Sequence, residues 1–113
     1  MAPREPILDR EISIERYTTA PNTLNEEIKT WAPYVTRWAA RRDAASAENV
    51  KAGDLGSYQI SWFVVRSDTE TRTITAADRF THDGSTWEIR ERPKETQHGR
   101  NRYLEITGIR DAD

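Results

Sequence analysis

The sequence predicts a small all-β protein, an antiparallel β-barrel or sandwich with long loops and one short helix. Several short segments alternate apolar and polar residues, polar stretches rich in turn-forming residues separate them, and a single segment has a helix-favouring composition. A chain of 113 residues has room for one hydrophobic core. We therefore expect a flexible N-terminal arm over residues 1–8 and a single domain over residues 9–113.

The first strand is predicted over residues 10–17, where Ile12 and Ile14 share one face and polar side chains share the other. This alternation is typical of a strand with one buried and one solvated face. The following residues 18–30 are polar, with Pro21 as a breaker. They predict a long loop whose last residues form a short extended piece.

The next two segments differ in composition. The apolar spacing in residues 34–42 fits either a strand or a helix, and we favour a strand. Residues 43–52 predict the one short helix, because Asp43 is a suitable N-cap, alanines follow it, and Gly53 is placed to end it.

Residues 58–65 form the strongest strand pattern, with large apolar side chains on both faces. A strand that is apolar on both faces is expected to be central in its sheet. Trp62 of this segment and Trp87 further along share strand faces with isoleucines. We expect both indoles to pack in the core rather than to form a stacking platform for bases.

The last predicted elements are a hairpin and a strand. Residues 80–82 and 86–90 flank the dipeptide Asp83-Gly84, whose glycine suits the positive φ of a tight hairpin turn. After a polar stretch, residues 103–109 alternate again and predict the final strand.

The sequence carries no recognisable catalytic, cofactor or metal site. Cysteine is absent, which excludes disulfides, thiolate zinc sites and a cysteine nucleophile. His82 and His98 have no metal-binding spacing, and His82 is expected to be an ordinary polar surface residue at the hairpin. A pairing of His82 with Ser85 lacks any supporting hydrolase signature. No apolar run is long enough to span a bilayer, and no signal peptide is present, so we expect a soluble protein.

The charge balance argues against a protein that coats nucleic acid. Seventeen basic and nineteen acidic residues give a formal net charge of −2. Residues 90–102 are locally basic and would concentrate positive charge at one end of the barrel. A solvated hairpin is the preferred interpretation, and contact with an acidic partner or with DNA phosphates is the alternative. The candidate basic end consists of Arg92, Lys94, Arg100 and Arg102.

The order of these features is more informative than any one of them. The strand of residues 8–16 leads into a threonine-rich piece, an acidic stretch that ends in Trp31, and a later pattern Arg-aromatic-x-x-Asp-Gly-x-x-aromatic-x-Ile over residues 79–89. In this order the chain resembles the head-tail joining proteins of tailed bacteriophages, also called head-completion or stopper proteins. The resemblance covers residues 8–109. One departure is the polar stretch of residues 90–93, where relatives carry an apolar residue, and it leaves the pose of the 91–101 loop open. The other matching segments are residues 17–19, 25–31, 35–40 and 103–106.

The resemblance implies a structural adaptor that is not an enzyme, needs no cofactor and contacts no membrane. It would dock as a homo-oligomeric ring between the portal-adaptor complex and the tail terminator or tail tube proteins, and would be monomeric when free. In some members such a ring closes the DNA channel after packaging, where non-specific contact with DNA is expected. The expected location is the head-tail interface of a virion or gene transfer agent particle, assembled in the cytoplasm of a bacterial host.

The resemblance also directs attention to two loops. The segment between the second and third strands, residues 43–56, is the candidate for projecting into the channel or contacting neighbouring subunits. The loop of residues 18–30 is the candidate for docking a partner. The named candidates are Asp43, Ser46, Glu48, Asn49, Lys51 and Asp54 in the first loop, and Asn22, Asn25, Glu26 and Glu27 in the second.

A generic nucleic-acid-binding barrel of the OB type is the alternative function. It predicts a salt-dependent affinity for free oligonucleotides that is lost when Arg100 and Arg102 are changed to glutamate.

Overall fold

The computed structural model describes residues 5–44 and 58–111. Within them the chain forms seven β-strands and one short 3-10 turn, and no helix is long and apolar enough to cross a membrane. The elements are β1 (Arg10–Pro21), β2 (Glu27–Asp43), β3 (Tyr58–Arg66), η1 (Thr71–Thr73), β4 (Arg79–His82), β5 (Ser85–Ile89), β6 (Lys94–Glu95) and β7 (Tyr103–Asp111).

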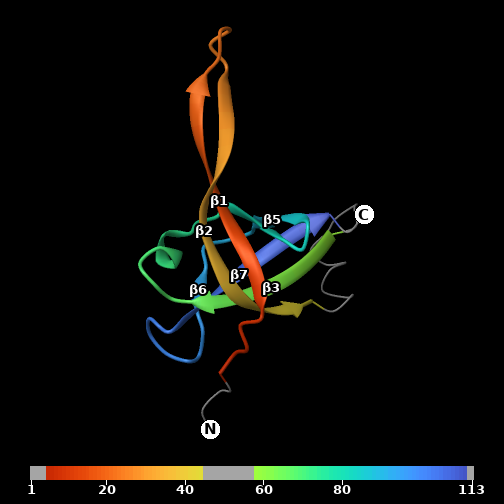
Figure 1. Ribbon diagram of the computed structural model, residues 1–113, viewed down its shortest axis with the longest axis vertical. Coiled ribbons are helices and arrows are strands. Elements are labelled where there is room, and N and C mark those ends of the chain that lie inside the picture. Colours follow the sequence, from red (N-terminus) through yellow and green to blue (C-terminus); the bar gives the residue numbers. More distant parts are fainter. Residues whose placement is uncertain (1–4, 45–57, 112–113) are drawn as a thin grey trace.

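All strand pairs are antiparallel, in the order β3-β2-β1-β4-β5-β7-β6. A further pairing of β3 with β7 closes six of these strands into a ring (Figure 1), and the short β6 pairs with the first half of β7. The all-β antiparallel prediction is confirmed. The prediction that the third strand is central is confirmed as well, because β3 lies between β2 and β7.

The core fills the inside of the ring and is built around three aromatic side chains. Phe63 of β3 contacts Phe80 and Trp87 edge-on, with ring centroids 4.8 and 5.2 Å apart. On β7, Gly108 faces the side chains of Phe80 and Trp87, and a Cβ added there would come within 2.8 Å of Cζ of Phe80. Aliphatic side chains complete the core: Ile12, Ile14, Val35, Val65, Ile74, Ile89, Leu104 and Ile106.

The two tryptophans expected in the core have different environments. Trp87 is 1% exposed, which confirms the prediction for that residue. Trp62 is half-buried on the outer face of β3, where the guanidinium of Arg42 lies 4.0 Å from the ring centroid. The expectation was wrong for Trp62 because the inner face of β3 carries Ser61, Phe63 and Val65 instead.

His82 is also placed differently from the expectation. It is 7% exposed rather than a surface residue, because β4 alternates and turns both Phe80 and His82 inward. Its Nδ1 lies 3.0 Å from the carbonyl oxygen of Glu11. Its Nε2 has no hydrogen-bond partner within residues 5–44 and 58–111, so Ser85, although opposite in register, does not pair with it.

The predicted hairpin is confirmed. Asp83 and Gly84 connect β4 to β5 with φ angles of 53° and 80°, the left-handed values that a tight two-residue turn requires.

The prediction of a strand over residues 34–42 is also confirmed, because this segment belongs to β2. The predicted helix lies outside the described residues except for its start, where Asp43 is the last residue of β2 and Ala44 has no regular structure.

The predicted loop of residues 18–30 is wrong over most of its length, whereas the extended piece expected at its end is confirmed by β2. β1 continues to Pro21, β2 begins at Glu27, and only a short turn separates them. The prediction failed because these residues show no alternation of burial: every side chain from Thr18 to Thr30 is exposed. Two strands that pair with each other satisfy the backbone groups that face the partner strand without a core beneath them, and the outward-facing groups are open to water.

Candidate functional site

The paired ends of β1 and β2 form a two-stranded ribbon that leaves the ring. β4 pairs with β1 only over Ser13–Glu15, and β3 pairs with β2 only from Ala39 onward. Between these limits β1 and β2 pair only with each other. We call residues 16–32 the ribbon. It projects along the longest axis of a molecule that measures 59 × 36 × 21 Å (Figure 1).

A β-bulge marks the point where the ribbon departs. Ile14 of β1 is opposite Val35, whereas the next residue, Glu15, is opposite Pro33, so Tyr34 is an extra residue on β2. Such a bulge bends the strand and increases its local twist. The apolar pair Ile14 and Val35 thus ends the buried part of this hairpin, and the ribbon begins beyond it.

Arg16 anchors one face of the ribbon to the ring. Its Nε and Nη2 donate to the two carboxylate oxygens of Asp78, both at 3.1 Å, and Nη2 also donates to the carbonyl oxygen of Thr73 at 3.2 Å. The hydrogen bond with Asp78 raises the pKa of Arg16, so the guanidinium stays charged. The same guanidinium lies 3.9 Å from the ring centroid of Tyr34, the bulged residue. This bidentate pair therefore fixes the bulge against the segment that precedes β4.

Arg79 anchors the other face. Its Nε donates to Glu15 at 2.6 Å, and its guanidinium lies 4.0 Å from the ring centroid of Trp31. Trp31 packs edge-on against Tyr17 at 5.0 Å, and the ammonium of Lys29 lies 4.5 Å from the Tyr17 ring. Charged and aromatic groups alternate in this row, which stiffens the lower part of the ribbon without a hydrophobic core.

The tip of the ribbon, residues 22–26, is ordered by one side chain. The side-chain oxygen of Asn22 accepts hydrogen bonds from the backbone N–H groups of Leu24 at 2.8 Å and Glu26 at 2.9 Å. Asn25 adopts a φ of 62°, which asparagine tolerates better than most residues. Of the predicted docking residues, Asn22 and Asn25 therefore shape the turn, whereas Glu26 and Glu27 present exposed carboxylates.

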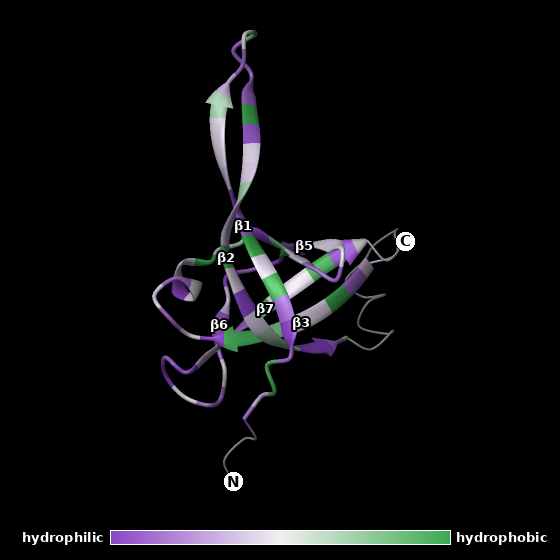
Figure 2. Cartoon of the chain, viewed as in Figure 1, coloured by the Kyte–Doolittle hydropathy of each residue, from purple (hydrophilic) through white to green (hydrophobic). Residues whose placement is uncertain are grey.

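Sequence reasoning missed the apolar side chains of the ribbon. Leu24 is 76% exposed at the tip, and Ile28, on β2 opposite Ala20, is 47% exposed. Figure 2 shows a hydrophobic end to the ribbon, with hydrophilic segments directly below it. The sequence signal for an exposed apolar tip was the single leucine, Leu24, inside a polar, turn-forming stretch, because a tight turn does not require a large apolar side chain.

The residues of the basic end are exposed, but the chain neutralises part of their charge. Lys94 lies 3.2 Å from a carboxylate oxygen of Glu91, and Arg102 donates to Glu5 at 2.9 Å. A hydrogen bond from Tyr103 lowers the pKa of Glu5, which favours its charged form. Half of the four named cations are thus paired within the chain, and the charge available to nucleic acid is smaller than the sequence suggests.

Asp43 is the one predicted channel-loop residue within the described residues. Its Oδ1 accepts from Ser61 Oγ at 2.6 Å and from Arg41 Nε at 2.7 Å. The hydrogen bond from Ser61 is the main cause that lowers the pKa of Asp43. These bonds hold Asp43 against the end of the sheet. The remaining candidates lie outside the described residues: Ser46, Glu48, Asn49, Lys51 and Asp54.

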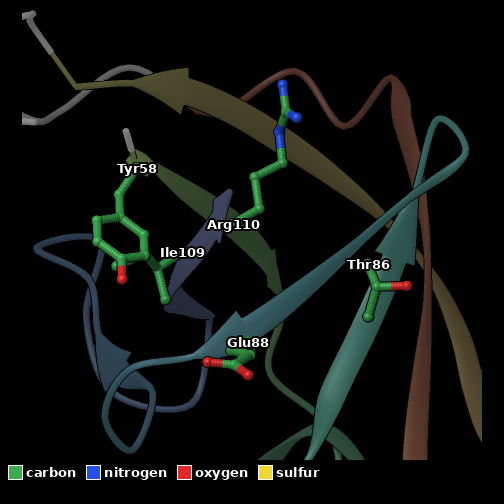
Figure 3. A pocket seen from close by; sticks show the side chains of 5 residues that line it. All are labelled: Tyr58, Thr86, Glu88, Ile109 and Arg110. Atoms are coloured by element: carbon green, nitrogen blue, oxygen red, sulfur yellow. The ribbon is translucent and has the colours of Figure 1, made fainter. Parts of the chain in front are cut away.

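The described part of the chain has no group of three or more metal-ligating side chains. A pocket at one end of the ring is lined by Tyr58, Thr86, Glu88, Ile109 and Arg110. Figure 3 shows the guanidinium of Arg110 and the carboxylate of Glu88 pointing away from each other. Arg110 donates instead to Gln59 at 2.6 Å, so these charged groups do not converge on one point.

Both the sequence and the fold of this chain match known proteins. Residues 4–109 match the family described as phage head completion protein. A chain in the virion of a native gene transfer agent particle superposes with a TM-score of 0.70 at 18% identity, over 96% of this chain and 98% of that one. A protein from Shigella flexneri 2a, solved in solution, superposes with a TM-score of 0.63 at 22% identity, over 93% of each chain.

At these identities the two structures show a common fold, and a search of curated proteins finds no match. The family match carries more, because it spans residues 4–109 and includes the ring, the ribbon and the basic end. The chain therefore belongs to the phage head completion protein family, and is a structural protein of the virion that acts with other head and tail proteins.

Proposed function

We propose that several copies of this chain assemble into an oligomeric ring, distinct from the ring of strands within each copy. This oligomeric ring would lie between the portal-adaptor complex and the tail and so join head to tail. The family supports a head-completion role, and the observation that carries the finer proposal is the ribbon. A closed ring of strands leaves few free edges, whereas both edges of the ribbon lack a strand neighbour within the described residues. An arm of this kind suits contact with a neighbouring molecule.

The ribbon is suited to a docking role because its base is rigid. Arg16 fixes one face to the ring through its ion pair with Asp78, and Arg79, itself paired with Glu15 in the ring, fixes the other face through its contact with Trp31. Preorganisation of this kind lowers the entropy that is lost when a partner binds. The exposed carboxylates of Glu26 and Glu27 then stand at a defined distance from the ring.

The second part of the proposal is that the assembled ring retains packaged DNA in the head. This part rests on the resemblance to stopper proteins. The roles of residues 43–56 in the channel and of residues 1–8 as a flexible arm stay predictions.

Deletion of the gene from a phage or gene transfer agent that encodes it tests both parts. Particles that lack the protein should package DNA yet remain tailless. Once released from the cell, these tailless heads should lose their DNA faster than complete particles do. Electron microscopy counts tailed particles, and nuclease sensitivity measures the loss of DNA. Normal tail joining in the absence of the protein would refute the proposal.

A further inference from the structure

We propose that the ribbon tip of one copy inserts Leu24 into an apolar pocket beside η1 on a neighbouring copy. This inference deepens the proposed function and rests on it, because it requires copies to lie next to each other. The two halves of the contact are both present on every chain.

The tip is a preformed knob. Leu24 is 76% exposed, and its backbone N–H is held by the side chain of Asn22, so little ordering is needed on binding. Glu26, two residues after Leu24, and Glu27, the first residue of β2, are both exposed. The tip and the residue that follows it therefore combine one large apolar side chain with two carboxylates.

The receiving site, which we call the η1 pocket, has the opposite character. Its apolar lining consists of the half-buried Pro93 and of the outer edges of two core side chains, Ile74 and Leu104, which are 1% and 6% exposed. Thr71, Arg72 and Arg92 line the pocket as well. Its volume is about 220 Å³, below the range of cofactor and drug sites. This size suits one side chain. Glu95 also lines the pocket, so its rim has two positive groups and one negative group.

Charge complementarity favours a second copy as the occupant. The tip offers two carboxylates to a rim with an excess of arginine, and arginine pairs with carboxylates through charge-assisted hydrogen bonds. Arg92 and Arg72 are both exposed. The side chain of Arg72 makes a single hydrogen bond, of 3.3 Å to Ser67, among those found in the described residues.

The tip cannot reach the η1 pocket of its own chain. Arg16, at the base of the ribbon, touches Thr73, the residue that precedes Ile74 of the pocket. The ribbon then extends six residues away from this point, from Arg16 to Pro21. At a rise of about 3.3 Å per residue, the tip lies roughly 20 Å away. The occupant must come from another molecule.

A contact between two different surfaces of identical chains is heterologous, so each copy uses its tip on one neighbour and its pocket on the other. Repetition of such a contact generates a ring where the rotation closes. The contact of the ribbon tip with the η1 pocket would therefore join neighbouring subunits of the proposed oligomeric ring.

Cysteine cross-linking tests the contact directly, because the chain has no cysteine of its own. The double variant Leu24→Cys with Glu95→Cys places one thiol at the tip and one in the η1 pocket. Mild oxidation of assembled particles should give a ladder of covalent oligomers on a non-reducing gel. The matched control is Leu24→Cys with Thr86→Cys, whose second thiol lies on a different pocket, and it should give no ladder. A control ladder as strong as that of the test variant would overturn the proposal.

Charge exchange provides a second test that keeps Leu24. Glu26→Arg and Arg92→Glu should each lower the yield of tailed particles about tenfold, and the two combined should restore it. Circular dichroism of the purified variants confirms folding. Absence of both the ladder and the rescue, in particles that still contain the protein and carry tails, overturns the inference and leaves the proposed function intact. Normal tail joining without the protein would instead refute the proposed function.

Discussion

The ring and the ribbon are stabilised by different physical means. The ring encloses Phe63, Phe80 and Trp87, each no more than 1% exposed. None of the ribbon side chains, residues 16–32, is buried, because the last buried pair of this hairpin is Ile14 and Val35. The ribbon is held by ion pairs and by cations that lie over aromatic rings. One chain therefore carries a part stabilised by the hydrophobic effect and a part stabilised by directed polar contacts, and the second part is the one that we propose to contact other molecules.

The largest difference between the two parts should appear on truncating apolar side chains. Phe63→Ala should lower the free energy of unfolding by about 3–5 kcal/mol, because it removes the phenyl group that contacts both Phe80 and Trp87. Leu24→Ala should change it by less than about 0.5 kcal/mol, because Leu24 is 76% exposed. Urea denaturation measures both. Comparable losses for the two variants would show that the ribbon tip packs on the ring.

Breaking the ribbon anchor should have an intermediate effect. Arg16→Gln leaves the carboxylate of Asp78, which is 4% exposed, without its bidentate partner and should cost about 1–3 kcal/mol. Hydrogen exchange should increase more in the ribbon than in β3 and β7. The control is Arg10→Gln, whose contact with Asp9 is 3.9 Å long and exposed, and which should leave exchange unchanged.

Gly108 tests how tightly the ring is packed. Gly108→Ala should destabilise the protein by about 1–3 kcal/mol, because the new Cβ would meet the Phe80 ring at 2.8 Å. Thr107→Ala, at the preceding residue of β7, should cost less. Equal stability of the Gly108→Ala variant and the parent would contradict the close packing seen at this position.

The smallest expected effect is a pH dependence near η1. Burial acts to raise the pKa of Asp68, but hydrogen bonds from the Thr71 N–H and the Arg37 guanidinium lower it overall. A depressed folded pKa means that this stabilisation is complete above about pH 4, the ordinary aspartate value, and is lost as pH falls through the folded value. Asp68→Asn should therefore be less stable than the parent at pH 7 and approach it at pH 3. Because Asp68 is 38% exposed, solvent screening keeps the effect small.

Sequence patterns predicted the ring better than the ribbon for a physical reason. The alternation of Ile12 and Ile14, the turn at Asp83-Gly84 and the apolar run of β3 all record burial or backbone geometry, and the structure confirms each. The ribbon buries nothing, so its strands resemble a loop in sequence. Interior positions also depend on strand curvature and register, which is why Trp62 and His82 were misplaced.

The candidate site was predictable in part. The docking role of the polar stretch around Asn22 and Glu26 stays a prediction. Its projection as a ribbon and the exposure of Leu24 were not predicted, because they follow from the bulge at Tyr34 and from the anchors on both faces. The pocket beside η1 joins Ile74 to Leu104, which are distant in the chain. No local sequence pattern predicts a pocket formed by residues that are so far apart in the chain.

The open edges of the ribbon also bear on how the protein survives before it is assembled. Unpaired strand edges invite edge-to-edge aggregation, and proteins commonly counter this with proline and charged residues. The ribbon and its base carry Pro21 and Pro33, together with Glu27 and Lys29, on the strands whose edges are open. These residues disfavour indiscriminate strand pairing while leaving the apolar tip available. We therefore expect the ribbon to resist edge-to-edge aggregation of free chains while its exposed apolar tip stays accessible to the neighbouring copy that we propose it contacts.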